Sequence, residues 1–293
     1  MLMNRIVSFF KRFFTFVVHG QPIVNVTPRI VVLNNNNLLY GRTALITGGT
    51  SGIGKAIANA FLKAGANVII TSRTKERAES IAKEINKPFE NQFVKGMQLD
   101  NENVGSFKES FFCLLQEIGD EKIDILVNNA GVRGGRWGNA TTEEYDKVMD
   151  TNLKGVFFLS EIVARYMKEN DIHGNILNIC SASSLRPANS AYCLSKWGMR
   201  ALTEGLAKTL IPYDIVVNGI APGPTATPMF GMNTGDNLIS RVQPNKRYTT
   251  VEEIANMAVV YVSDMARTIV GDIAYMTGGA AVLTYDDNKY DFK

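Results

Sequence analysis

A tyrosine and a lysine that stand four residues apart, Tyr192 and Lys196, are the side chains of this sequence best suited to move a proton. In a helix, residues four positions apart share a face, so the phenol and the amine would point into the same space. Free tyrosine has a pKa of about 10 and is a poor acid or base at neutral pH. A neighbouring ammonium group would stabilise the phenolate and lower that pKa, so Tyr192 would exchange a proton with an alcohol or carbonyl oxygen.

Other polar residues and glycines stand where apolar runs of the sequence end. Three such runs are followed by Ser181, by Asn128–Gly131 and by Pro222-Gly223. In an open α/β sheet, ligands bind at the carboxyl ends of the strands. Ser181 would therefore lie at the edge of the sheet where a ligand binds. Ser183 and Ser184 are alternatives, but Ser181 fits the end of the strand best.

A glycine-rich turn, Thr47–Gly54, joins a strand expected at 43–47 to a helix expected at 54–63. Glycines allow a sharp turn and a close approach to a pyrophosphate, whose charge the free N–H groups of the helix would meet. The turn therefore predicts a dinucleotide site. Its expected cofactor-binding residues are Gly48, Thr50, Ser51, Gly52, Ile53 and Gly54.

The end of the second expected strand indicates which dinucleotide binds. An acidic residue there would bind a ribose 2′-hydroxyl, but the chain reads Ser72-Arg73 and has no acid. The guanidinium of Arg73 would pair with a 2′-phosphate, and Ser72 would donate a hydrogen bond to it. NADP(H) is therefore favoured over NAD(H). If Arg73 is instead a solvated loop residue, the cofactor preference stays open.

Short apolar runs alternate with amphipathic helical stretches from Gly41 onwards. The expected strands are 43–47, 67–71, 93–99, 123–127, 174–179, 215–220 and 272–276. Continuously apolar strands separated by helices indicate a parallel sheet that is covered on both faces. The predicted fold is a Rossmann-like, doubly wound α/β domain spanning residues 41–293, with residues 1–40 as an N-terminal extension.

Residues 1–40 differ from the rest of the chain. They carry four basic residues and no acid, whereas the chain as a whole has a net charge of +3. Apolar residues recur at helical spacing in this segment, namely Met3, Ile6, Phe10, Phe13 and Val17. We interpret residues 1–18 as a cationic amphipathic helix and Asn34–Asn37 as part of a linker. The helix would lie on a membrane surface, serve as a targeting segment, or pack on protein.

The composition excludes several classes of protein. No apolar stretch is long enough to span a membrane as a helix, and residues 41–293 lack the basic excess of a nucleic-acid-binding domain. The three cysteines and two histidines show no metal-ligand spacing, so no metal is expected. Unpaired cysteines fit a reducing compartment. We expect a cytoplasmic protein, with peripheral membrane contact or organelle targeting left open.

Taken in chain order, these motifs resemble those of the short-chain dehydrogenase/reductase family, in its compact single-domain branch. The match spans about residues 41–283. It rests on Thr47–Gly54, Asn128–Gly131, Asn152, Ser181, Tyr192 with Lys196, and Pro222-Gly223 with Thr227. The resemblance implies a single-domain oxidoreductase.

The resemblance implies a role for each matching residue. Tyr192 would be the general acid and base, with its pKa lowered by Lys196 and by the positive nicotinamide ring of the oxidised cofactor. Ser181 would bind the substrate oxygen. Lys196 would hold the nicotinamide ribose, and Asn152 would hold a water that links Lys196 to solvent. The cofactor would be contacted by Tyr192 and Lys196 and also by Asp100 at the adenine, Thr227 at the nicotinamide end, Asn128, Ala130, Gly131, Pro222, Gly223 and Thr225.

We therefore expect an NADP(H)-dependent enzyme that interconverts a carbonyl and a secondary alcohol by hydride transfer. A 3-oxoacyl-thioester reductase and a sugar or polyol dehydrogenase both remain open. The alternative is a non-catalytic dinucleotide-binding subunit of a membrane-associated assembly, which would not need Ser181, Tyr192 and Lys196 together. The resemblance also implies a homodimer or homotetramer, with helices near 150–170 and 190–210 at the interface.

Three loops over the strand ends would choose the small-molecule substrate: 132–139, 183–189 and 229–247. The first two contain Arg133, Arg136 and Arg186, and the third has the apolar and glycine content of a short mobile lid. One hypothesis is that these arginines favour an anionic substrate. The other is that they are solvated or contact a second subunit.

Overall fold

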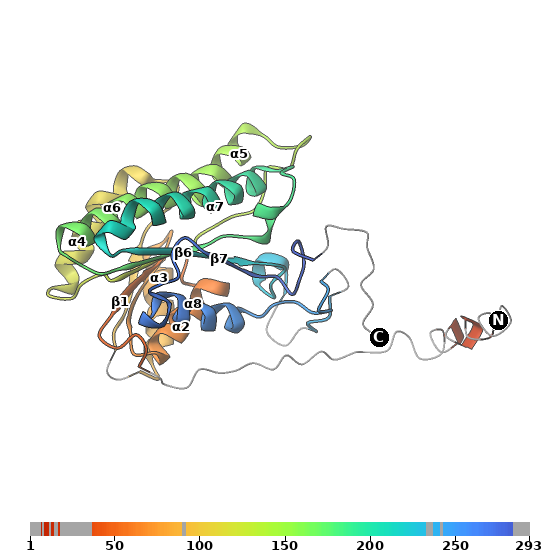
Figure 1. Ribbon diagram of the computed structural model, residues 1–293, viewed down its shortest axis with the longest axis horizontal. Helices are drawn as coiled ribbons and strands as arrows, with labels where there is room; N and C mark the ends of the chain where they lie inside the picture. Colours follow the sequence, from red (N-terminus) through yellow and green to blue (C-terminus); the bar gives the residue numbers. More distant parts are fainter. Residues whose placement is uncertain are drawn as a thin grey trace.

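The computed structural model describes residues 37–89, 92–232, 237–240 and 243–283, together with residues 7, 9–11, 13, 14 and 17 of a helix near the N-terminus (Figure 1). The predicted membrane-surface or targeting role of residues 1–18 falls largely outside these ranges. Of the residues that are described there, Phe9, Phe10, Phe13 and Phe14 are exposed, and the Phe9 and Phe13 rings stack with their centroids 6.4 Å apart. The membrane contact stays a prediction.

Within the described residues, seven parallel strands form one sheet in the order β3-β2-β1-β4-β5-β6-β7. The strands are β1 (Thr43–Ile46), β2 (Asn67–Ser72), β3 (Val94–Gln98), β4 (Ile125–Asn128), β5 (Asn175–Ile179), β6 (Val216–Pro222) and β7 (Ile273–Met276). Each overlaps one of the predicted strands. The Rossmann-like fold class is therefore confirmed, and the order of strands reverses between β1 and β4.

Helices cover both faces of the sheet, with α2, α3 and α8 on one side and α4, α5, α6 and α7 on the other (Figure 1). Their bounds are α2 (Gly52–Lys63), α3 (Lys75–Asn86), α4 (Phe107–Ile118), α5 (Thr142–Met149), α6 (Gly155–Glu169), α7 (Ala191–Leu210) and α8 (Val251–Val262). Two apolar cores follow from these layers. One packs Phe61 and Val259 under the sheet, and the other packs Phe107 and Leu159 above it.

The packed domain begins before the predicted boundary at residue 41. Leu39 is completely buried in the core, and its backbone N–H donates to Ala64 O at 2.8 Å. Arg42 then donates to Val262 O at 2.6 Å and to Asn175 Oδ1 at 2.9 Å, which ties the first strand to α8 and β5. Leu39, which was assigned to the N-terminal extension, therefore takes part in the fold, because its side chain lies in the lower core.

At Gly96, the backbone of β3 lies directly against the backbone of α3. A Cβ atom there would stand 2.3 Å from the backbone carbon of Ala78 and from the backbone nitrogen of Glu79, and neither can turn aside. We expect Gly96→Ala to lower the free energy of unfolding by about 1–3 kcal/mol, since α3 must move away. Urea denaturation measures the change.

The matched control for that variant is Gly205→Ala. Gly205 lies in α7 and is exposed, and a Cβ atom added there would meet no neighbouring atom within 4 Å. In a helix, alanine is favoured over glycine by about 1 kcal/mol, so this variant should be neutral or stabilised. If both variants lost stability equally, the close approach of α3 would not be the cause.

Candidate active site

A cavity of about 630 Å³ lies along the carboxyl ends of the strands. The segments that follow β1 to β6 all contribute to its wall, from the glycine-rich turn after β1 to Pro222–Pro228 after β6. This is the edge at which ligands of open α/β sheets bind. The volume lies within the usual range for small-molecule and cofactor sites.

The glycine-rich turn has the backbone that a pyrophosphate site needs. Gly48 has a φ of +62°, and a Cβ atom there would meet Ala130 Cα at 3.0 Å. A Cβ atom at Gly54 would meet Asn129 Nδ2 at 2.4 Å. Asn129 braces the turn, because its Nδ2 donates to Thr47 O at 2.9 Å and to Gly48 O at 3.1 Å. The turn can therefore be neither substituted nor opened without disturbing the loop after β4.

The end of the cavity beside β2 is basic. Ser72 and Arg73 line it, as predicted, and so does Arg77, which was not predicted from the sequence. Arg77 lies in the first turn of α3 and its Nε donates to Thr50 Oγ1 at 3.2 Å, so it joins the glycine-rich turn to α3. Its position four residues after Arg73, just inside the helix, was the signal that could have found it.

Tyr192 and Lys196 project from the start of α7 into the cavity. The helix begins where Ser190 Oγ accepts a hydrogen bond from Cys193 N at 3.2 Å, so Tyr192 stands in its first turn. Lys196 Nζ donates to Ile179 O at 2.8 Å and lies 6.0 Å from the centroid of the Tyr192 ring. The two side chains therefore share one space, as the spacing predicted.

Burial governs the protonation of both side chains. It raises the pKa of Tyr192, while the Ser181 hydroxyl and the charge of Arg133 oppose that rise. Burial also lowers the pKa of Lys196 to about 8. That Lys196 and the oxidised nicotinamide together lower the pKa of Tyr192 stays a prediction.

Ser181 is the strand-end serine whose hydroxyl reaches Tyr192. It lines the cavity, interacts with the phenol, and accepts a hydrogen bond from Ser183 N at 3.1 Å. Ser184 is completely buried and donates its hydroxyl proton to Ser181 O at 2.8 Å. Ser183 also lines the cavity.

Asn152 lies within the π-helical segment η2 (Asp150–Lys154), which joins α5 to α6. Its side chain is fully buried and holds the loop after β4: Oδ1 accepts from Val132 N at 2.8 Å, and Nδ2 donates to Val132 O at 2.9 Å. Nδ2 also donates to Ser195 Oγ at 3.1 Å. The side chain therefore braces two walls of the site, and a role in holding water stays a prediction.

The structure brings most predicted site residues to one cavity wall. Those that line it are Gly48, Thr50, Ser51, Gly52, Ile53, Ser72, Arg73, Asp100, Ala130, Gly131, Ser181, Tyr192, Lys196, Pro222, Gly223, Thr225 and Thr227. Gly54, Asn128 and Asn152 do not. Asn128 is fully buried and donates to Ser160 Oγ and Asn178 Oδ1 at 2.9 and 2.8 Å, so it joins β4 to α6 and β5. The neighbouring Asn129 lines the cavity instead.

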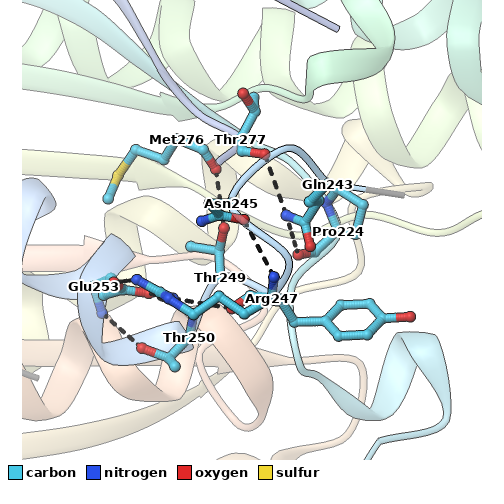
Figure 2. A network of polar contacts seen from close by, with 10 residues as sticks. Pro224, Gln243, Asn245, Arg247, Thr249, Thr250, Glu253, Met276 and Thr277 are labelled. Atoms are coloured by element: carbon cyan, nitrogen blue, oxygen red, sulfur yellow. Dashed lines mark hydrogen bonds and ion pairs between the residues drawn. The ribbon is translucent and has the colours of Figure 1, made fainter. Parts of the chain in front are cut away.

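A polar network that includes Pro224 fixes the segment that leads into α8 (Figure 2). Gln243 Nε2 donates to Pro224 O at 3.3 Å and to Thr277 O at 3.2 Å. Arg247 forms an ion pair with Glu253, and the guanidinium holds the pKa of that carboxyl below its usual range. Thr250 and Glu253 cap the N-terminus of α8 with reciprocal hydrogen bonds. Part of the predicted loop 229–247, namely 233–236, 241 and 242, is outside the described residues.

Membrane spans and metal clusters are both missing from the described part of the chain. Across the described ranges, no helix combines the length and hydropathy needed to cross a bilayer. Among the same residues, no group of three or more histidine, cysteine, aspartate or glutamate side chains is arranged to hold a metal ion.

Comparison with known proteins identifies the family. Residues 42–237 match the family model described as short chain dehydrogenase. A 3-oxoacyl-[acyl-carrier-protein] reductase of Haemophilus influenzae is 36% identical, over 82% of this chain and 98% of its own. A 3alpha-hydroxysteroid dehydrogenase of Mediterraneibacter gnavus is 32% identical, over 83% of this chain and 98% of its own.

The fold and the cavity agree with solved structures of the same kind. The crystal structure of a gluconate 5-dehydrogenase from Burkholderia cenocepacia, in complex with NADP and tartrate, superimposes with a TM-score of 0.76. It is 29% identical, and the match covers 84% of this chain and 97% of that one. These relatives give no support to the alternative of a binding-only subunit. The chain is therefore an oxidoreductase that acts on CH–OH groups and belongs to the short-chain dehydrogenase/reductase family.

Proposed function

We propose that this protein is an NADP(H)-dependent oxidoreductase that interconverts a carbonyl and a secondary alcohol, with Tyr192 as its general acid and base. One observation carries the proposal: Ser181, Tyr192 and Lys196 line the same cavity as the glycine-rich turn. A dinucleotide held on that turn would reach the proton-transfer group with its other end. The protein's candidate substrates are a 3-oxoacyl thioester and a sugar or polyol, because the relatives include enzymes of both kinds.

The residues of the cavity fit a dinucleotide. Gly48 and Gly52 have φ angles of +62° and +52°, which favour glycine and allow the close approach of a pyrophosphate. Ile53 and the start of α2 would present N–H groups to the phosphates. Pro222, Gly223, Thr225 and Thr227 would border the nicotinamide end. Bound there, the cofactor supplies or accepts a hydride at the carbinol carbon.

Proton transfer is the task of the protein. In reduction, Tyr192 Oη would give its proton to the carbonyl oxygen while the carbon gains a hydride, so that a neutral alcohol forms. Ser181 would hydrogen-bond the same oxygen and stabilise the charge that develops on it. Because burial raises the pKa of Tyr192, the phenol is protonated at neutral pH and is set up as an acid. It would regain its proton from solvent before the next turnover.

NADP(H) is favoured by the two guanidiniums at the β2 end, Arg73 and Arg77. Each would pair with a ribose 2′-phosphate, which NADH lacks. We expect Arg73→Gln and Arg77→Gln each to lower kcat/KM with NADPH by about 10- to 100-fold, the usual value of one charge-assisted hydrogen bond. The values with NADH should change little. Steady-state kinetics with both cofactors measures this.

Lys75→Gln is the matched control for the cofactor variants. Lys75 lies between the two arginines in sequence and carries the same charge, but it is exposed, does not line the cavity, and pairs with Glu79 at 3.8 Å. The kcat/KM of this variant should stay within about twofold of the wild-type value with both NADPH and NADH. Equal losses with NADPH and NADH in the Arg73 and Arg77 variants would contradict a 2′-phosphate site.

The proposed function is tested by following the oxidation of NADPH with a panel of carbonyl compounds. The panel should contain 3-oxoacyl thioesters, keto sugars and keto sugar acids, because the relatives include enzymes of these kinds. Reduction of any of them that depends on Tyr192 supports the proposal. Binding of NADPH without oxidation by any member of the panel would contradict it.

We also propose that the chain forms a homodimer or homotetramer through α6 and α7, the helices predicted as interfaces. Both carry exposed apolar side chains: Phe157 and Phe158 on α6, and Leu194 and Trp197 on α7. Clustered exposed apolar residues are typical of interaction surfaces.

A further inference from the structure

We propose that Arg133 and Arg186 form an anion-binding subsite at the mouth of the cavity, so that the substrate is a carbonyl compound that carries a carboxylate or phosphate group. The inference rests on the proposed function, because it concerns the substrate of the same site. Both arginines line the cavity together with Ser181 and Tyr192. Arg136, the third arginine of these loops, does not.

The two segments that carry the arginines are joined into one rim. Ala191 N donates to Gly135 O at 2.8 Å, and Trp137 N donates to Asn189 O at 2.9 Å. Gly135 makes this approach possible, because its φ is +65° and a Cβ atom there would meet Ala191 Cβ at 2.6 Å. Residue 191 opens the helix that carries Tyr192. The rim is therefore held directly against the start of the catalytic helix.

The backbone at each arginine is anchored, while the side chain is exposed to the cavity mouth. The residue before Arg133, Val132, is held at both its N–H and its carbonyl by Asn152. The carbonyl of Arg186 accepts a hydrogen bond from Trp197 Nε1 at 2.8 Å. Both side chains are exposed. An incoming anion would thus meet two guanidinium groups on a backbone that is already fixed, so binding does not have to order that backbone.

The charge of this rim is one-sided. Residues 129–139 and 181–192 contain three arginines and no acidic residue. Over the described part of the chain, five cationic side chains and two acidic ones line the cavity. The two acids, Asp100 and Glu102, follow β3 at the edge of the sheet, and Glu102 accepts a hydrogen bond from Thr151 at 3.2 Å. Around Tyr192 the field is therefore positive.

Arg133 lies close to the reacting group, Tyr192. Its charge acts on the Tyr192 phenol, so the two groups are close enough to interact electrostatically. A planar guanidinium binds a carboxylate or phosphate with two parallel hydrogen bonds. An anion held by Arg133 and Arg186 would place a carbonyl of the same molecule near Ser181 and Tyr192. Such a rim would also draw anionic substrates from solution.

Two substrate pairs test the subsite, each of which keeps the type of carbonyl and changes the charge. One pair is acetoacetyl-CoA with the neutral N-acetylcysteamine thioester of acetoacetate, and the other is 5-keto-D-gluconate with the neutral ketose L-sorbose. We expect Arg133→Gln and Arg186→Gln to raise KM for the anionic member about tenfold more than for the neutral one. The pair that responds identifies phosphate or carboxylate as the group bound.

Arg136→Gln is the matched control, because Arg136 lies on the same rim and is exposed but does not line the cavity. The KM of this variant for both members of each substrate pair should stay within about twofold of the wild-type value. Equal increases in KM for charged and neutral members would overturn the inference while leaving the proposed function intact.

A binding measurement separates failure of the subsite from failure of the proposed function. Calorimetric titration of the NADP+-loaded protein with D-gluconate or with acetyl-CoA needs no turnover. Binding that is lost in Arg133→Gln and Arg186→Gln but kept in Arg136→Gln supports the subsite, even if none of the four ketones is reduced. Binding of neither anion to the wild type, or equal binding to all variants, overturns it.

Discussion

Tyr192→Phe is expected to lower kcat for carbonyl reduction by about 10²- to 10⁴-fold, the usual contribution of a positioned general acid. The variant removes one hydroxyl and keeps the ring, so the cavity wall formed by Tyr192 retains its shape. The affinity for NADPH should therefore change little. Steady-state kinetics gives kcat, and the fluorescence of bound NADPH gives the affinity.

Two serine variants serve as controls for the tyrosine. Ser181→Ala removes the hydroxyl that interacts with the phenol and should also lower kcat, by a smaller factor. Ser183→Ala removes a hydroxyl from the same cavity wall and should leave kcat near the wild-type value. If Tyr192→Phe kept full activity, another group would supply the proton, and the assignment of the acid would be wrong.

Much of the fold was predictable because parallel strands are buried on both faces. β5 was expected at 174–179 and lies at Asn175–Ile179, where every residue is buried. The ends of strands were less predictable. Ile123 is buried like a strand residue, but β4 begins at Ile125. Burial alone does not show where the regular pairing of a strand starts.

The convergence of the site residues was also predictable, since the carboxyl ends of parallel strands meet at one edge of the sheet. The direction in which each strand-end side chain points was not predictable, because it changes when the strand is shifted by one residue. Successive residues of a strand face opposite sides, so Asn128 turns into the interior and Asn129 reaches the glycine-rich turn. The partner of the Lys196 amine, Ile179 O, likewise depends on packing between α7 and β5.

Lys196→Met is expected to separate activity from stability. The variant removes the amine beside Tyr192 and should lower kcat/KM by about 10²-fold or more. Burial lowers the pKa of Lys196 from 10.5 to about 8, so the folded protein bears a cost for keeping this group charged at neutral pH. That difference corresponds to about 3 kcal/mol. Loss of the hydrogen bond to Ile179 O offsets about 1 kcal/mol of it.

The net result expected at pH 7 is a protein whose kcat/KM is about 10²-fold lower and whose free energy of unfolding is about 2 kcal/mol higher than those of the wild type. Urea denaturation measures it. In the wild type, the unfolded chain keeps this proton between pH 8 and 10.5 while the folded chain has lost it, so the cost disappears as the pH rises through that window. The free energy of unfolding of Lys196→Met should therefore exceed that of the wild type by less at pH 10 than at pH 7.

The same pKa predicts the pH dependence of the reaction. The ammonium form of Lys196 is present below pH 8 and is lost above it, so kcat/KM for reduction should fall as the pH rises through about 8. Lys154→Met is the control, because Lys154 is exposed and pairs with Asp150 at 3.1 Å. It should leave both the pH profile and the stability near those of the wild type. Two outcomes would contradict the lowered pKa of Lys196. One is a wild-type profile of kcat/KM that stays flat to pH 10. The other is a Lys196→Met variant with a lower free energy of unfolding than the wild type.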